Sequence, residues 1–210
     1  MLPICLLCVV LTQAAPQTPG DASKPAEAPS AGRARPEEKW TVDYKPGPFR
    51  MYRAADGNLY WYATFTLTNR TGKERRLAPR WELLDEQGRL VPAGQRVDSD
   101  VTRAILKMLN DPSLEEVSSI MGEIGQGEAS AKTGVVVFPA GPESRRLSLL
   151  VSGLSTERSS IRDPKSGKPV MLRKTLRIDY TVPGERSAVK GELPLAEAET
   201  GQANPGWIMR

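Results

Sequence analysis

Histidine is absent from this 210-residue sequence, and its two cysteines, Cys5 and Cys8, both lie close to the N-terminus. Histidine is the side chain most used for proton transfer near neutral pH, and it is the most common transition-metal ligand. Cysteine supplies thiol nucleophiles and structural zinc sites. The scarcity of both disfavours metal centres, thiol catalysis and histidine-based triads, and we expect no cofactor. Chemistry that depends on carboxylates or lysine remains open.

The N-terminal segment is apolar and short. Residues 1–11, MLPICLLCVVL, carry no charged side chain and are followed by Ala14. A run of this length matches the apolar region of a secretory signal peptide and is too short to span a bilayer. We predict a signal peptide over residues 1–14, export to the periplasm or the cell exterior, and no membrane span in the mature chain. Leu7 precedes Cys8 where a small residue would precede a lipidated cysteine, so lipid attachment is the weaker alternative.

Three further regions follow the signal peptide. Residues 15–38 are rich in Pro, Ala and charged residues, so they cannot bury enough apolar surface to fold, and we predict a disordered tether. Residues 39–196 are long enough for one domain that buries roughly 70% of its unfolded surface. We expect residues 197–210 to be a loose tail, from which Trp207 can dock on the domain.

The charge balance is mild. The formal net charge is +4 and the calculated pI is about 9.1. A domain that binds nucleic acid usually has a stronger and more concentrated basic and aromatic pattern. The composition therefore does not indicate a nucleic-acid partner.

Strand signals dominate the domain. Apolar residues occupy every second position from Leu59 to Leu67, and Asp56-Gly57 before them is typical of a turn. This pattern predicts one hairpin over residues 51–62 and another over 65–83. Pro79 cannot donate a hydrogen bond to a sheet, which suggests a sheet edge or a bulge there. We expect the core to be built around four large apolar residues of these strands: Trp61, Phe65, Leu67 and Trp81.

A helical segment interrupts the strands. Val97, Val101, Ile105 and Met108 recur at helical spacing. Ser113-Leu-Glu-Glu116 has the form of a capping box for a second helix. We therefore predict a two-helix insert over about residues 97–122.

Strand patterns then resume, in segments with β-branched residues and turn signals at their ends: 127–132, 134–138, 146–151 and 169–182. Lys174 interrupts the apolar face of the last strand, which suggests a β-bulge at Arg173-Lys174 that turns Lys174 outward. Many short strands without βαβ alternation predict a mainly β fold, an antiparallel immunoglobulin-like β-sandwich with a short helical insert.

Three tracts carry a resemblance to known sequences. YWYATFTLTNRTGKERRLAP (60–79), VSGLSTE (151–157) and DPKSGKPVMLRKTL (163–176) together resemble a family of uncharacterised exported proteins of planctomycete bacteria. The resemblance covers nearly the whole domain. It implies bacterial export and a β-sandwich, and it brings no activity or site residue.

A basic loop is the main candidate for binding. If the last two strands pair, its side chains gather at one end and along one face, which suits a sulfated, phosphorylated or carboxylated glycan. The alternative is an ordinary solvated face balanced by Glu157, Asp163 and Asp179. Arg145, Arg146 and Arg177 adjoin the candidate binding residues, which are Arg158, Arg162, Lys165, Lys168, Arg173 and Lys174.

Catalysis has weaker support. A glycosidase needs a pair of carboxylates, but Asp98 with Asp100 and Glu115 with Glu116 already have capping or helix-dipole explanations. A Ser-Lys arrangement with Lys132 or Lys174 has no supporting motif. We predict an exported, non-enzymatic domain with a binding or structural role in the cell envelope. A polyanion-binding module is the first alternative and a carboxylate-dependent hydrolase the second, and the candidate partners are an envelope protein or an anionic polysaccharide.

Overall fold

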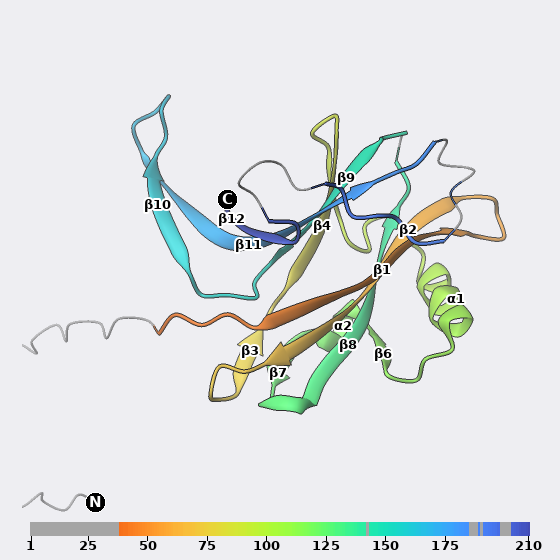
Figure 1. Ribbon diagram of the computed structural model, residues 1–210, viewed down its shortest axis with the longest axis horizontal. Helices are drawn as coiled ribbons and strands as arrows, with labels where there is room; N and C mark the ends of the chain where they lie inside the picture. The colour runs from red at the N-terminus through yellow and green to blue at the C-terminus, as the bar shows by residue number, and fades with distance from the viewer. Residues whose placement is uncertain (1–37, 142, 185–188, 190, 198–202) are drawn as a thin grey trace, which may run out of the picture. The chain divides into compact units, whose positions relative to one another are not determined.

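Two mainly antiparallel sheets form the framework of the described residues in a computed structural model (Figure 1). The predicted signal peptide over 1–14, and the predicted tether over 15–38 apart from Glu38, lie outside the residues that the structure describes. Those residues are 38–141, 143–184, 189, 191–197 and 203–210.

The first sheet has the strand order β1-β2-β8-β6. β1 (Asp43–Arg53) and β2 (Leu59–Asn69) form the predicted hairpin. β2 pairs on its other edge with β8 (Gly127–Pro139) rather than with the residues after it, so the predicted second hairpin over 65–83 is wrong. β6 (Leu114–Glu116) is short and runs parallel to β8.

The second sheet has the order β10-β11-β9-β4-β5. An additional strand, β12, pairs with β11. The bounds are β4 (Arg80–Asp85), β5 (Leu90–Pro92), β9 (Arg146–Ser152), β10 (Arg158–Arg162), β11 (Pro169–Thr181) and β12 (Gly206–Met209).

A small third sheet pairs β3 (Arg75–Leu77) with β7 (Gly122–Ile124). Pro79 lies in the short link between β3 and β4, where the chain passes from this sheet to the second one. Because proline cannot donate a ladder hydrogen bond, this position between two strands accommodates it without loss.

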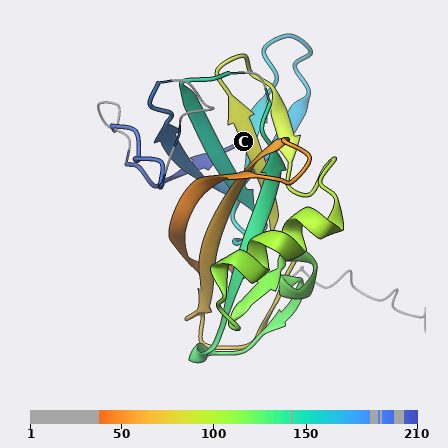
Figure 2. The same ribbon diagram turned by 90° about the vertical axis from the view of Figure 1, so that its right-hand side faces the viewer.

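The predicted helical insert is present, but its second half differs from the prediction. α1 (Ser99–Leu109) is capped by Asp98, whose side chain accepts a hydrogen bond from the Asp100 amide. Its buried residues Val101 and Ile105 pack on the outer face of the first sheet, and Figure 2 shows the helix in front of these strands. α2 spans only Val117–Ile120.

The predicted capping box at 113–116 is wrong because Ser113 has a different partner. Its amide and hydroxyl both donate to Asp111 Oδ1, at 2.9 and 2.7 Å, which forms a turn. The following residues pair with β8 as β6, and α2 begins only after them.

The core lies between the two sheets and contains the predicted residues. Trp61, Phe65, Leu67 and Trp81 are all buried. Phe65 of the first sheet contacts Trp81 of the second with ring centroids 4.7 Å apart. Phe49 and Tyr180 make a similar contact at 4.6 Å. These contacts between the facing sheets confirm a mainly β sandwich with a short helical insert.

The described end of the chain is not the loose tail predicted over 197–210, because β12 pairs with β11 and adds to the second sheet. The Asn204 side chain holds the preceding segment against the same strand. It accepts from the Asp179 amide at 2.9 Å and donates to the carbonyls of Asp179 and Ala196, each at 2.8 Å. The Asn204 side chain thus makes hydrogen bonds to the β11 backbone of the kind that a neighbouring strand would make.

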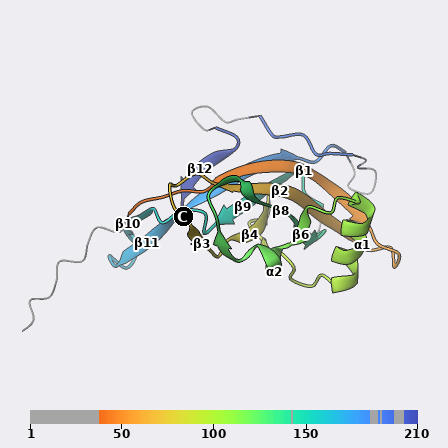
Figure 3. The same cartoon turned by 90° about the horizontal axis from the view of Figure 1, so that it is seen from below.

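α1 and the β10–β11 hairpin lie at opposite ends of the domain (Figures 1 and 3). All five residues of β10, RSSIR, are exposed. The hairpin therefore extends the second sheet beyond the sandwich, and it carries most of the predicted basic loop.

Candidate functional site

The predicted basic residues share the β10–β11 hairpin. Arg158 and Arg162 lie on β10, Lys165 and Lys168 lie in the connecting turn, and Arg173 lies on β11. All five are exposed. The sequence predicted a loop over these residues, whereas the structure has an additional strand, β10, whose pairing with β11 brings the cations onto one hairpin.

Strand register decides which of these side chains share a face. Arg158 is paired directly with Arg173 across the two strands. Side chains of directly opposite residues project from the same face, and residues two apart on a strand share that face as well. Arg162 therefore lies on the same face as Arg158 and Arg173.

Lys174 departs from the prediction in its placement. β11 continues through Arg173-Lys174 in unbroken register with β12, without the predicted bulge. Lys174 thus stays on the side that faces the core further along the strand. Its ammonium lies 2.5 Å from Glu157 Oε1 and 5.1 Å from the centre of the Trp207 ring. We assign Lys174 a structural role and remove it from the candidate ligand-binding set.

The turn that carries the two lysines is organised by Asp163. Its carboxylate accepts from the Lys165 amide and from the Ser166 hydroxyl, each at 2.8 Å. These hydrogen bonds, the Lys165 amide first, hold the pKa of Asp163 below its ordinary value. Gly167 allows the tight turn because its φ of 68° is unfavourable for other residues.

The carboxylates expected to neutralise the basic loop have other partners. Asp163 caps its own turn, and Glu157 binds Lys174, whose hydrogen bond lowers the pKa of Glu157. Asp179 binds Arg177 Nε at 2.9 Å. Among the described residues, no carboxylate forms an ion pair with Arg158 or Arg173. The interpretation of the loop as a locally balanced surface therefore does not hold for this pair.

More arginines lie on the same outward side of the second sheet. Trp81 and Leu83 of β4 point into the core, so Arg80 and Glu82 point out. We call this surface the arginine face, defined by Arg80, Arg146, Arg158, Arg162, Arg173, Arg177 and Arg210.

Carboxylates on that face pair with Arg177 and with Arg210. Arg177 pairs with Asp179, and Arg210 pairs with Glu82 on β4. Across the described part of the chain, Arg80 makes no ion pair. The face therefore carries a net positive charge at the base of the hairpin.

A shallow hollow joins the hairpin to the sheet. It is lined by Ser152, Arg173, Thr175 and Arg210. Arg80 is paired directly with Ser152 on the neighbouring strand. Guanidinium groups offer forked donors that match the oxygens of phosphate, sulfate and carboxylate, and the Ser152 hydroxyl adds one more donor. The arrangement suits an oxyanion.

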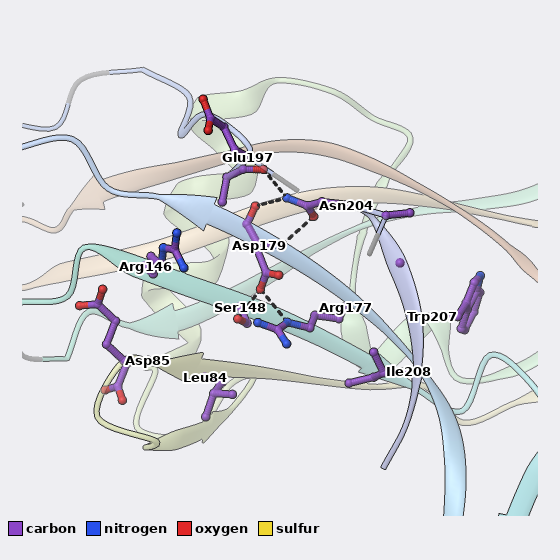
Figure 4. A pocket seen from close by; sticks show the side chains of 14 residues that line it. Leu84, Asp85, Arg146, Ser148, Arg177, Asp179, Glu197, Asn204, Trp207 and Ile208 are labelled. Carbon is purple, nitrogen blue, oxygen red and sulfur yellow. Dashed lines mark hydrogen bonds and ion pairs between the residues drawn. The ribbon is translucent and has the colours of Figure 1, made fainter. Parts of the chain in front are cut away.

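Another pocket lies further along the arginine face, where Arg146, Ser148, Arg177 and Asp179 meet the segment around Asn204 (Figure 4). Asp179 is its central group. It accepts hydrogen bonds from the Ser148 hydroxyl and from Arg177. These hydrogen bonds order the pocket wall. They occupy Asp179 with donors from the chain itself.

Two other carboxylates that line this pocket also accept hydrogen bonds from the chain. Asp85 accepts from the amide and the guanidinium of Arg89. Glu86 accepts from the Arg145 amide at 3.0 Å. Carboxylates bound in this way are poorly placed to attack a substrate or to exchange protons with it.

The sequence candidates for catalysis are also engaged elsewhere. Asp98 caps α1, and Asp100 pairs with Arg103 at 2.6 Å. Glu115 and Glu116 are neighbours on β6, not in a helix as expected, so their side chains point to opposite faces. Lys132 donates to the Ile120 carbonyl at 3.3 Å.

Within the described ranges, no three Asp or Glu side chains cluster in a way that could hold a metal ion. No helix among the described residues is both long and apolar enough to cross a membrane. No protein-family model, curated protein or solved structure matches this chain. Similarity to known proteins therefore assigns neither a family nor an activity.

The sequence did not reveal that Arg80 and Arg210 join the hairpin arginines. They lie far from residues 158–173 along the chain, and only strand pairing brings them together. A usable signal was present in β4, because the alternation around Trp81 and Leu83 already places Arg80 on the outward side.

Proposed function

We propose that this protein is an exported, non-enzymatic binding module whose arginine face takes an extended polyanion, with an anionic polysaccharide of the cell envelope as the ligand class. The observation that carries the proposal is the direct pairing of Arg158 with Arg173, because among the described residues neither guanidinium forms an ion pair with an Asp or Glu side chain. Like charges directly opposite on a sheet are destabilising. A bound oxyanion between them would turn this repulsion into attraction.

The spacing of the cations favours a polymer over a single small anion. Arg158 and Arg162 are four residues apart on β10, which corresponds to roughly 13 Å. Arg80 extends the positive charge from the hairpin base onto the sheet. A chain with repeated sulfate, phosphate or carboxylate groups can contact several of these positions at once.

The alternatives have less support. A hydrolase needs two carboxylates placed about a common substrate, whereas Asp85, Glu86 and Asp179 in the pocket beside Asn204 already accept hydrogen bonds from the chain. A purely structural role gives no reason for the arginine pair. Export is proposed from the apolar N-terminal segment over 1–14, and deletion of that segment should retain the protein in the cytoplasm when cell fractions are compared.

Retention on immobilised heparin tests the binding function. The wild-type protein should be retained and should elute with rising NaCl, because exposed charge interactions are screened by salt. The Arg158→Gln, Arg173→Gln double variant should elute at clearly lower salt. A matched control, Arg53→Gln with Arg103→Gln, removes the same net charge from sites outside the arginine face. If both double variants shift equally, net charge explains the retention and the proposed site is wrong.

A further inference from the structure

A third cavity lies on the outer face of the first sheet, beside the C-terminal end of α1. Its base includes three threonines on neighbouring strands, Thr64 and Thr66 of β2 and Thr133 of β8. Apolar side chains form two of its sides. These are Pro46 and Pro48 of β1 on one side, and Leu109 and Leu114 near α1 on the other.

The β1 backbone approaches this cavity unusually closely. The register of β1 against β2 shifts between Pro46 and Phe49, and Gly47 lies within this irregularity. A Cβ atom on Gly47 would lie 2.2 Å from Thr64 Oγ1. No other residue fits here without moving Thr64, so one wall of the cavity is bare backbone held against the Thr64 hydroxyl.

More cations than carboxylates line the cavity. Lys45 and Arg50 contribute two cations, and Asp111 contributes one carboxylate. Asp111 Oδ1 already accepts both hydrogen bonds from Ser113. Arg50 Nε is buried and has no hydrogen-bond partner among the described residues. A buried guanidinium nitrogen without an acceptor is rare in folded proteins, and the same side chain lines the cavity, so the guanidinium of Arg50 is a candidate group for binding an anion there.

We propose that this cavity is a binding site for a small organic monocarboxylate with a short apolar body. The carboxylate accepts hydrogen bonds from Arg50, and a threonine hydroxyl at the base supplies a further donor. The apolar body lies between the proline and leucine side chains. This site shares no residue with the arginine face, so the failure of one proposal would not affect the other.

Ligand-observed NMR on the full chain tests this assignment with hexanoate and with hexanamide, its neutral counterpart. Hexanoate should bind with a Kd on the order of 1 mM, as expected for a ligand of its size, and hexanamide should bind at least about tenfold more weakly. Arg50→Gln should weaken hexanoate binding by about tenfold or more. Arg53→Gln, an exposed arginine on the same strand, serves as the matched control and should leave the Kd unchanged.

A second variant keeps the test informative if Arg50→Gln fails to fold. Thr64→Val preserves the shape of the base and removes its hydroxyl, so it should weaken hexanoate binding several-fold while the circular dichroism spectrum stays that of the wild type. Three results would each overturn the assignment: no hexanoate binding up to about 20 mM, equal binding of hexanoate and hexanamide, or unchanged affinity in a folded Arg50→Gln or Thr64→Val protein.

Discussion

Arg158 and Arg173 lie directly opposite each other on β10 and β11, and among the described residues neither guanidinium forms an ion pair with an Asp or Glu side chain. Elsewhere on the same face arginine does pair with a carboxylate, as in the ion pair of Arg177 with Asp179. The hairpin therefore keeps a local repulsion that a single carboxylate would remove. Under the proposed function, a bound oxyanion would offset this repulsion, as at other binding sites whose residues conflict with the local demands of folding.

This conflict makes a prediction about Arg158. Replacing it with glutamate creates an opposite-charge pair with Arg173, which should raise the free energy of unfolding by about 0.2–1 kcal/mol. The same variant should elute earlier from heparin, because the positive pair is gone. Urea denaturation and salt-gradient chromatography measure the two effects. A variant that is both less stable and equally well retained would contradict the assigned role of the pair.

The contact between the sheets predicts a large effect at Phe65. Its ring is buried and lies 4.7 Å from the Trp81 ring across the core. Phe65→Ala should lower the free energy of unfolding by about 3–5 kcal/mol, through lost burial and an unfilled cavity. Phe65→Leu should cost clearly less. Urea denaturation compares the two variants, and a loss of under about 1 kcal/mol for alanine would show that the sheets do not pack as described.

Asn204 fixes the segment before β12 to β11. Its side chain makes hydrogen bonds with the Asp179 amide, the Asp179 carbonyl and the Ala196 carbonyl. Asn204→Ala should cost about 1–3 kcal/mol because partly buried backbone groups lose their partners. Hydrogen exchange at the Asp179 amide should also accelerate. Asn58→Ala, in an exposed turn, is the control, and unchanged exchange at Asp179 in the Asn204 variant would refute this function of the side chain.

The Glu157–Lys174 pair predicts a dependence of stability on pH. The hydrogen bond from Lys174 lowers the pKa of Glu157 from its ordinary value of 4.5. A carboxyl whose pKa is lower in the folded state contributes stability above the unfolded pKa, and this contribution is lost as the pH falls through the folded pKa. Stability should therefore decline below about pH 4.5.

Glu157→Gln removes this titration. The difference in urea midpoint between wild type and variant should be largest at about pH 7 and should shrink toward about pH 3. A constant difference across this range would mean that Glu157 is not coupled to Lys174 in solution.

Local sequence patterns predicted much of the fold. The alternation through β2 identified a strand, a core face and the buried Trp61 and Phe65, because period-two burial is a local property. The pairing of β2 with β8 was not predictable in the same way, since the intervening residues give no register signal. The capping box failed at Ser113 because Asp111, two residues earlier, offered a closer acceptor.

The candidate site was predicted only in part. The hairpin cations were visible because they are close in sequence, whereas Lys174 was assigned to the wrong face. Its apolar neighbours suggested a bulge, but Glu157 and Trp207 instead stabilise the lysine on the inward side. The alternation around Trp81 predicts the outward direction of Arg80, but the position of Arg80 and Arg210 beside the hairpin depends on pairing between segments far apart in the sequence.

The most direct test of the arginine face is an NMR titration of the arginine Nε–Hε signals with a sulfated heparin hexasaccharide. Binding on this face predicts progressive shifts for Arg80, Arg158 and Arg173, with no shift for Arg103 on α1 at the opposite end of the domain. Added NaCl should reverse the shifts. Equal shifts at Arg103, or no shift at Arg158 and Arg173 with saturating ligand, would contradict the proposed site.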